Sequence, residues 1–136
     1  MRFDTKIAIV VRAGLLPWQQ LNVTAFLASG VAAGLDDLAG KPYEDGDGNR
    51  YLPMFRQPVL VYEGDAAVLA AARERAVSRG LATAIYTEDL FATGNDDDNR
   101  AAVRAVATAD LHLAGLAVYG PRNAVDKVLK GLSLHG

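Results

Sequence analysis

Apolar and polar residues alternate along the chain in blocks that predict strands and helices in turn. The run 6–11, Lys-Ile-Ala-Ile-Val-Val, is almost wholly apolar and rich in β-branched residues. This pattern is typical of a strand that is covered on both faces. Later runs of similar character predict three more strands, at 58–62, 81–86 and 111–119.

Helical patterns follow these strands. The first helix is predicted over 18–33 after Pro17, which suits a first turn, and its apolar residues at helical spacing are Leu21, Ala25, Phe26, Ala28 and Ala32. The second runs from a cap at Asp65 to Arg79. The third spans about 97–108, with Asp96, Asp97 and Asp98 as its cap, and the last follows Gly120-Pro121.

Strands that alternate with helices predict an α/β fold. We expect a three-layer α/β/α domain over residues 1–136, with a four-stranded, mostly parallel sheet between the helices. Residues 35–57 interrupt the alternation, because they are rich in Gly, Asp and Pro. This insert is predicted to form a small hairpin or an ordered loop.

Composition excludes several kinds of chemistry. The chain has no cysteine, so it forms no disulfide, thiolate metal site or thiol nucleophile. Its first apolar run ends at Arg12 and is too short for a signal peptide or a membrane span, which predicts a cytoplasmic protein. A net charge of −2 does not favour tRNA as a partner and predicts no binding to DNA.

Motifs for metals and nucleotide cofactors are incomplete. The run 45–49, Asp-Gly-Asp-Gly-Asn, begins like a calcium loop, but Arg50 and Arg56 stand where that template needs Gly and Glu. Neither G-x-G-x-x-G nor G-K-[ST] occurs, and the histidines, His112 and His135, have no evident partners. We therefore expect neither a metal nor a cofactor.

Polar residues gather where the predicted strands end. They open the first helix, occupy the loop after the third strand and begin the last helix, and Arg12 ends the first strand. Ligands in open α/β sheets bind beyond the carboxyl ends of the strands, and a helix start beside an arginine suits an anion. These residues either line a site or serve as caps and surface groups: Arg12, Gln19, Gln20, Asn22, Thr24, Glu88, Asp89, Thr93, Arg122 and Asn123.

Several motifs resemble those of known families. The run 120–128, Gly-Pro-Arg-Asn-Ala-Val-Asp-Lys-Val, followed by Leu-Ser-Leu at 132–134, resembles the closing motif of type II peptidyl-tRNA hydrolases. The runs 9–12 and 57–59 are similar to their first and second strands. The whole chain more closely resembles a bacterial family catalogued as a domain of unknown function, through 17–19, 21–26, 86–94 and 121–134.

The resemblance to the hydrolases implies their fold and a homodimer. It also implies that their helix lysine falls on Gln19 or Gln20, and that Asp89 or Glu88, with Thr93, stand at their acidic and threonine positions. A glutamine stabilises an oxyanion or holds a phosphate much less than a lysine does.

Two functions remain open. We favour a binding module that takes a small anionic or amide-bearing ligand, or a protein, in the cleft. The alternative is a hydrolase of an ester or amide such as peptidyl-tRNA. In that enzyme Asp89 or Glu88 would activate water, Thr93 would bond the reacting group, and Gln20 with Asn22 would position the carbonyl.

Overall fold

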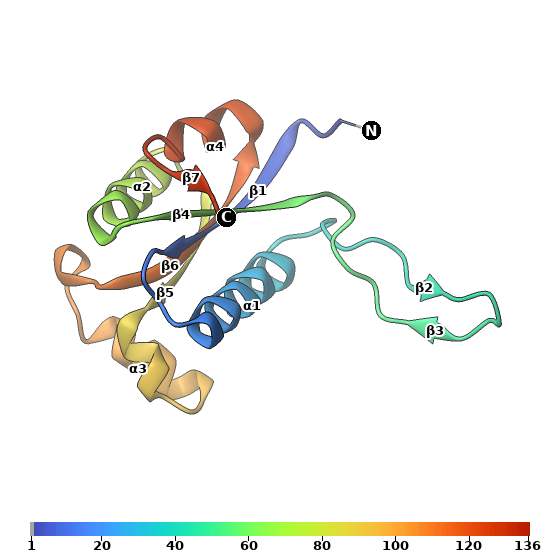
Figure 1. The fold of residues 1–136 in the computed structure, drawn as a ribbon, viewed down its shortest axis with the longest axis horizontal. Helices are drawn as coiled ribbons and strands as arrows, with labels where there is room; N and C mark the ends of the chain where they lie inside the picture. The colour runs from blue at the N-terminus through green and yellow to red at the C-terminus, as the bar shows by residue number, and fades with distance from the viewer. Residues whose placement is uncertain (1) are drawn as a thin grey trace.

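A computed structural model describes residues 2–136 and places a five-stranded sheet between helices (Figure 1). In chain order the elements are β1 (Thr5–Arg12), α1 (Pro17–Gly34), β2 (Tyr43–Glu44), β3 (Arg50–Tyr51), β4 (Val59–Gly64), α2 (Ala66–Ser78), β5 (Ala82–Thr87), η1 (Glu88–Ala92), α3 (Asp96–Arg104), η2 (Thr108–Asp110), β6 (Leu113–Pro121), α4 (Arg122–Val128) and β7 (Ser133–Leu134).

The sheet is mixed and mostly antiparallel, with the order β5-β6-β1-β4-β7. Only β1 and β4 pair in parallel, whereas β6 runs antiparallel to both β1 and β5, and β7 runs antiparallel to β4. The expectation of four mostly parallel strands is therefore wrong in both number and direction. A parallel neighbour needs a crossover that covers the sheet, but α3 buries no residue, so β6 returns antiparallel beside β5.

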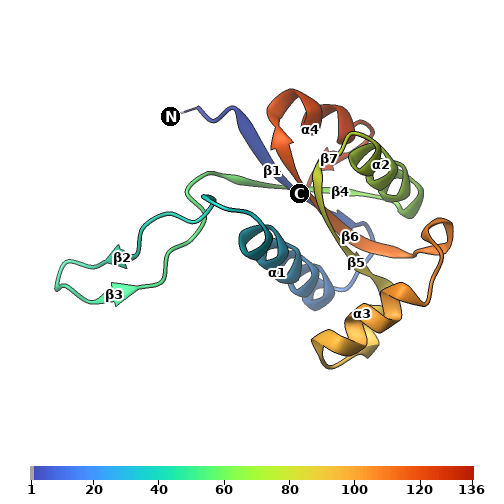
Figure 2. The same ribbon diagram turned by 180° about the vertical axis from the view of Figure 1, so that it is seen from behind.

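The helices cover both faces of the sheet. α1 lies on one face, and α2 and α4 lie on the other (Figure 2). Side chains of β1 alternate between the two cores, with Ile7, Ile9 and Val11 in the α1 cluster and Ala8 and Val10 in the α2/α4 cluster. Burial on both faces explains why the sequence of β1 is continuously apolar.

α1 begins and ends where the sequence predicts, but a different stripe of it is buried. Val23, Leu27 and Val31 face the core, whereas Leu21 is 72% exposed and Phe26 is 51% exposed. The helix carries apolar residues on every side, so helical spacing in the sequence did not identify the buried side.

The insert forms an arm that leaves the body of the protein. Leu38 is buried and Phe55 packs on the same core, so these residues anchor the base of the arm. Beyond them β2 and β3 pair only in a sheet of their own, and the arm extends away from the helices (Figure 1). Of the two forms expected for the insert, a hairpin or an ordered loop, the structure has antiparallel pairing of β2 and β3.

The turn of this arm is held by Asp45. Its carboxylate accepts hydrogen bonds from Tyr51 Oη at 2.7 Å and from the backbone N–H of Asn49 at 2.9 Å and of Asp47 at 3.0 Å. These bonds lower the pKa of Asp45 from 3.8 to about 2, and the bond from Tyr51 has the largest effect. The oxygens that resembled calcium ligands thus organise a turn.

The arm should therefore loosen only in strong acid. Because the pKa of Asp45 is lower in the folded arm, its stabilising contribution is full above pH 3.8 and is lost as the pH falls toward 2. We expect the Asn49 amide resonance to titrate with a midpoint near 2, and Tyr51→Phe to raise that midpoint toward 3.8. An unchanged midpoint in Tyr51→Phe would contradict this account.

Candidate functional site

A pocket of about 470 Å³ lies between α1 and the segment that follows β5. This volume is within the range of small-molecule sites, roughly 300–1,000 Å³. Its lining comes from four places along the chain, namely one side of α1, the end of β5, η1 with the loop after it, and the start of α3. The residues are Trp18, Asn22, Phe26, Ser29, Tyr86, Leu90, Phe91, Thr93, Gly94, Asn95, Asp96 and Asn99.

Four aromatic side chains form one wall of the pocket. Phe91 lies edge-on to Trp18, with ring centroids 5.7 Å apart, and is tilted against Tyr86 at 5.1 Å. Phe26 is also tilted against Tyr86, with ring centroids 5.9 Å apart. The wall joins α1 to β5 and η1, and Trp18 and Phe26 remain about half exposed. Such rings offer both faces and edges to a flat ligand.

Amide and hydroxyl groups line the rest of the pocket. Tyr86 Oη donates to Asn22 Oδ1 at 3.3 Å, and burial raises the pKa of Tyr86, so the hydroxyl stays protonated. Thr93 Oγ1 donates to Leu90 O at 2.9 Å and contacts the side-chain amide of Asn99. The Asn22 Nδ2 group makes no hydrogen bond among the described residues, which leaves a donor for a ligand.

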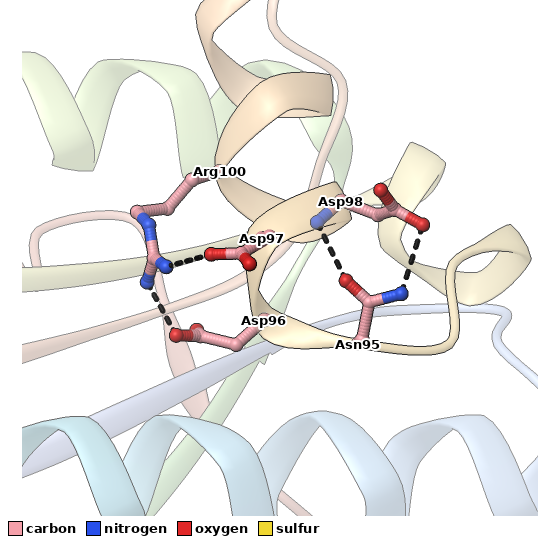
Figure 3. Close-up of polar contacts among 5 residues, drawn as sticks. All are labelled: Asn95, Asp96, Asp97, Asp98 and Arg100. Atoms are coloured by element: carbon pink, nitrogen blue, oxygen red, sulfur yellow. Dashed lines mark hydrogen bonds and ion pairs between the residues drawn. The ribbon is translucent and has the colours of Figure 1, made fainter.

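The start of α3 contributes to the lining of the pocket. Figure 3 shows the polar contacts within this start. Asn95 Oδ1 accepts from Asp98 N at 2.9 Å, so Asn95 is the cap, and the three aspartates predicted to cap the helix occupy its first turn instead. Arg100 pairs with Asp96 and, at 2.6 Å, with Asp97. Asp96 is the only charged residue among the described residues that line the pocket, and it pairs with Arg100.

Within residues 2–136 no group of three or more His, Asp or Glu side chains is arranged to hold a metal ion. In the same range no helix is long and apolar enough to cross a membrane.

The structure brings Asn22 and Thr93 together at the pocket, and it places the other predicted residues of α1 elsewhere. Gln19 Oε1 accepts from Leu16 N at 3.0 Å, and Gln20 Nε2 donates to Leu15 O at 2.8 Å. Thr24 Oγ1 donates to the backbone of its own helix. These three side chains complete the local structure of α1.

Arg12 and Glu88 form an ion pair, and neither residue lines the pocket. Arg12 also donates to Leu113 O at 3.3 Å, so its guanidinium is used by the fold. Asp89 is exposed on η1 and does not line the pocket. Any part these residues play in binding or catalysis stays a prediction.

Arg122 and Asn123 lie at the opposite end of the sheet from Arg12. Pro121 pairs with Thr5, the first residue of β1, because β6 runs antiparallel to β1. Arg122 there donates to Phe3 O at 3.2 Å. The convergence expected from a parallel sheet is thus absent.

The sequence reading missed most of the pocket lining. The sequence predicts a strand at Tyr86 and a loop at Phe91, and no pattern marks Asn95 or Asn99 as site residues. Spacing does not reveal them because they meet Trp18 and Asn22 only through the tertiary fold. His135 does have partners, contrary to the expectation from the sequence. Its Nε2 lies 2.7 Å from Gln20 Oε1 and 3.8 Å from Glu63.

The fold and the pocket together define a mixed α/β domain with a small-molecule-sized pocket beside its first helix. The family model described as a protein of unknown function (DUF2000) matches residues 5–136, and the chain belongs to this family. The resemblance to a family of unknown function is thereby confirmed.

A solved structure of a protein of unknown function from Agrobacterium is similar throughout. The two chains are 41% identical, with a TM-score of 0.96, over 99% of this chain and 100% of the other. No curated protein matches the chain. Neither matching description mentions a peptidyl-tRNA hydrolase, so that part of the resemblance stays a prediction.

Proposed function

We propose that the protein is a binding module that takes a small, planar, uncharged ligand bearing amide-like groups in the pocket between α1 and η1. The observation that carries this proposal is the pairing of an aromatic wall with amide side chains in one pocket. Binding, and not chemistry on the ligand, is the proposed activity.

The aromatic wall supports a planar ligand. Trp18 and Phe26 are 56% and 51% exposed, although both are large apolar side chains that gain from leaving water. A flat ring placed against them and Phe91 would remove apolar surface from water and stack on the rings.

The polar lining supports an uncharged ligand with both donors and acceptors. The amides of Asn22 and Asn99 each offer a donor and an acceptor group. An anion would meet the carboxylate of Asp96, and a cation would have to compete with Arg100 for it. A neutral amide or heteroaromatic lactam matches this lining best.

Hydrolysis has less support. The glutamines at the position of the hydrolase lysine are bonded to the backbone of their own helix and the turn before it. Glu88, one of the two candidates for activating water, is paired with Arg12. Asp89, the other candidate, is exposed and does not line the pocket.

The test is a titration of the ¹⁵N-labelled protein with neutral planar heteroaromatic amides, each compared with its matched carboxylate. We expect the amides to shift the resonances of Asn22, Thr93 and Gly94, and the carboxylates to bind more weakly. Phe91→Ala should weaken binding roughly tenfold, because aromatic contacts contribute about 0.5–1.5 kcal/mol beyond area burial. Val77→Ala, on the exposed side of α2, is the matched control.

Two outcomes would overturn the proposal. One is the absence of any pocket shift across the set, or tighter binding of the carboxylates. The other is turnover of purified peptidyl-tRNA that disappears in Asp89→Ala, which would establish a hydrolase.

A further inference from the structure

A second pocket, of about 250 Å³, lies at the end of the sheet where β1 begins. We call it the β1 pocket. Its lining comes from the segment that leads into β1, from the entry to β4 and from Arg122, the first residue of α4. β1 begins beside the start of α4 because Thr5 pairs with Pro121 (Figure 1). The β1 pocket shares no lining residue with the pocket beside α1, so it is a separate place for a ligand.

Three cationic residues, Arg2, Lys6 and Arg122, line the β1 pocket, and no carboxylate among residues 2–136 lines it. Lys6 pairs with Asp126, whereas no ion pair joins Arg2 or Arg122 to a carboxylate of the described chain. Asp4 lines the adjoining hollow, also without such a pair in that range. Cations thus outnumber carboxylates here, although the whole chain has a net charge of −2. A local excess of positive charge in a hollow attracts anions.

Arg122 has donors left over after its contact with the fold. Its Nε and Nη2 donate to Phe3 O at 3.3 Å and 3.2 Å. A guanidinium carries five N–H groups, and the Nη1 group of Arg122 makes no hydrogen bond to any residue in the range 2–136. The planar fork of an arginine matches the oxygens of a phosphate or a carboxylate. Arg122 can therefore hold the start of the chain and an oxyanion at the same time.

Gln57 brings a buried amide to the same pocket, since it is only 8% exposed. Its Nε2 donates to Thr5 O and its Oε1 accepts from Thr5 Oγ1, and both distances are 3.3 Å, which is long for either kind of hydrogen bond. The second N–H of Nε2 has no acceptor among the described residues. Because a buried donor without a partner is costly, an anion bound here would satisfy a group that the fold leaves unmatched.

We propose that the β1 pocket binds a small phosphorylated molecule by its phosphate group, in addition to the neutral ligand proposed for the pocket beside α1. A phosphate monoester carries a charge of about −1.5 to −2 at neutral pH and three strong acceptor oxygens. The cations and the amide donor of the pocket come from four separate segments, which suits several oxygens around one centre. A carboxylate has one charge and two oxygens, and it would use fewer of these donors.

The size of the β1 pocket limits the rest of the ligand. Its volume lies just below the roughly 300 Å³ at which small-molecule sites usually begin. Phe3 and Leu60 add apolar side chains to the lining. The part that carries the phosphate is therefore a short, uncharged carbon group.

The test is a titration of the ¹⁵N-labelled full chain with glycerol phosphate, inorganic phosphate and acetate at constant ionic strength. We expect both phosphates to shift the resonances of Thr5 and Leu60 and the side-chain amide of Gln57, with glycerol phosphate binding more tightly. Acetate should bind at least about tenfold more weakly, because it can use fewer of the donors. The resonances of Asn22 and Gly94 should stay in place, which separates this test from that of the pocket beside α1.

Arg122→Gln should raise the dissociation constant of glycerol phosphate about tenfold or more, because it removes a charged donor. Arg104→Gln is the matched control, since it removes the same charge from the exposed end of α3. Arg122 also holds Phe3 O, so each variant is unfolded by heat with and without glycerol phosphate and serves as its own reference. The ligand should raise the melting temperature of the wild type and of Arg104→Gln, and raise that of Arg122→Gln much less.

Three results would overturn the proposal. They are the absence of shifts at Thr5, Leu60 and Gln57 with either phosphate, acetate binding as tightly as the phosphates, and equal weakening by Arg122→Gln and Arg104→Gln. Tighter binding of inorganic phosphate than of glycerol phosphate would show a site for the free ion and overturn the assignment to a phosphorylated molecule.

Discussion

Replacing Gly115 with Ala is expected to lower the free energy of unfolding by roughly 1–3 kcal/mol, the usual cost of overpacking a core. An added Cβ at this position would lie 2.6 Å from Val23 Cγ1 and 2.8 Å from Val10 O. The first atom belongs to a fully buried side chain of α1, and the second belongs to the backbone of β1. Neither atom can move away without disturbing the packing of the core. Gly115 is thus what lets α1 approach the sheet so closely.

Urea unfolding measures this loss directly. Gly34→Ala is the control, because a Cβ there meets nothing within 4 Å, and its stability should be unchanged or higher by up to about 1 kcal/mol. If Gly115→Ala unfolds at the same urea concentration as the wild type, α1 does not pack as closely on β6 at Gly115 as described.

Asp126→Ala is expected to lower the free energy of unfolding by about 1–3 kcal/mol. The substitution leaves the largely buried ammonium of Lys6 without its carboxylate partner. Lys6 is 9% exposed, and its Nζ lies 2.8 Å from Asp126 Oδ1 and 5.2 Å from the ring centroid of Tyr62. Burial lowers the pKa of Lys6, but the contacts with Asp126 and Tyr62 outweigh it and raise the pKa above 10.5. The pair therefore contributes fully at neutral pH, and its contribution is lost only as the pH rises beyond 10.5.

The matched control is Asp97→Ala, which removes an exposed partner of Arg100 and should change the free energy of unfolding much less than Asp126→Ala does. A second variant, Lys6→Met with Asp126→Ala, should recover most of the lost stability, because no charge is then left buried. Equal costs for Asp126→Ala and Asp97→Ala would show that the Lys6 pair is no more than a surface contact.

The candidate site shows how far sequence reasoning reaches. Asn22 and Thr93 were predicted from polar residues near strand ends, and they do line the pocket. Arg122 was placed with Arg12 on the assumption of a parallel sheet, and the antiparallel β6 separates them. Arg75 on α2 donates to Val128 O and Lys130 O at the end of α4, and helical spacing does not predict this contact. The positions of these residues depend on how distant segments, β6 and the end of α4, pack in the folded protein.

The sequence by itself determined the order of helices and main strands, the place of the insert and the family, because these depend on local periodicity, turn residues and motifs. The tertiary structure alone decided the direction of β6, the buried side of α1 and the pocket. An apolar run has the same pattern in either strand direction, and a helix that is apolar all round has no preferred side. Packing among distant segments chooses between these alternatives.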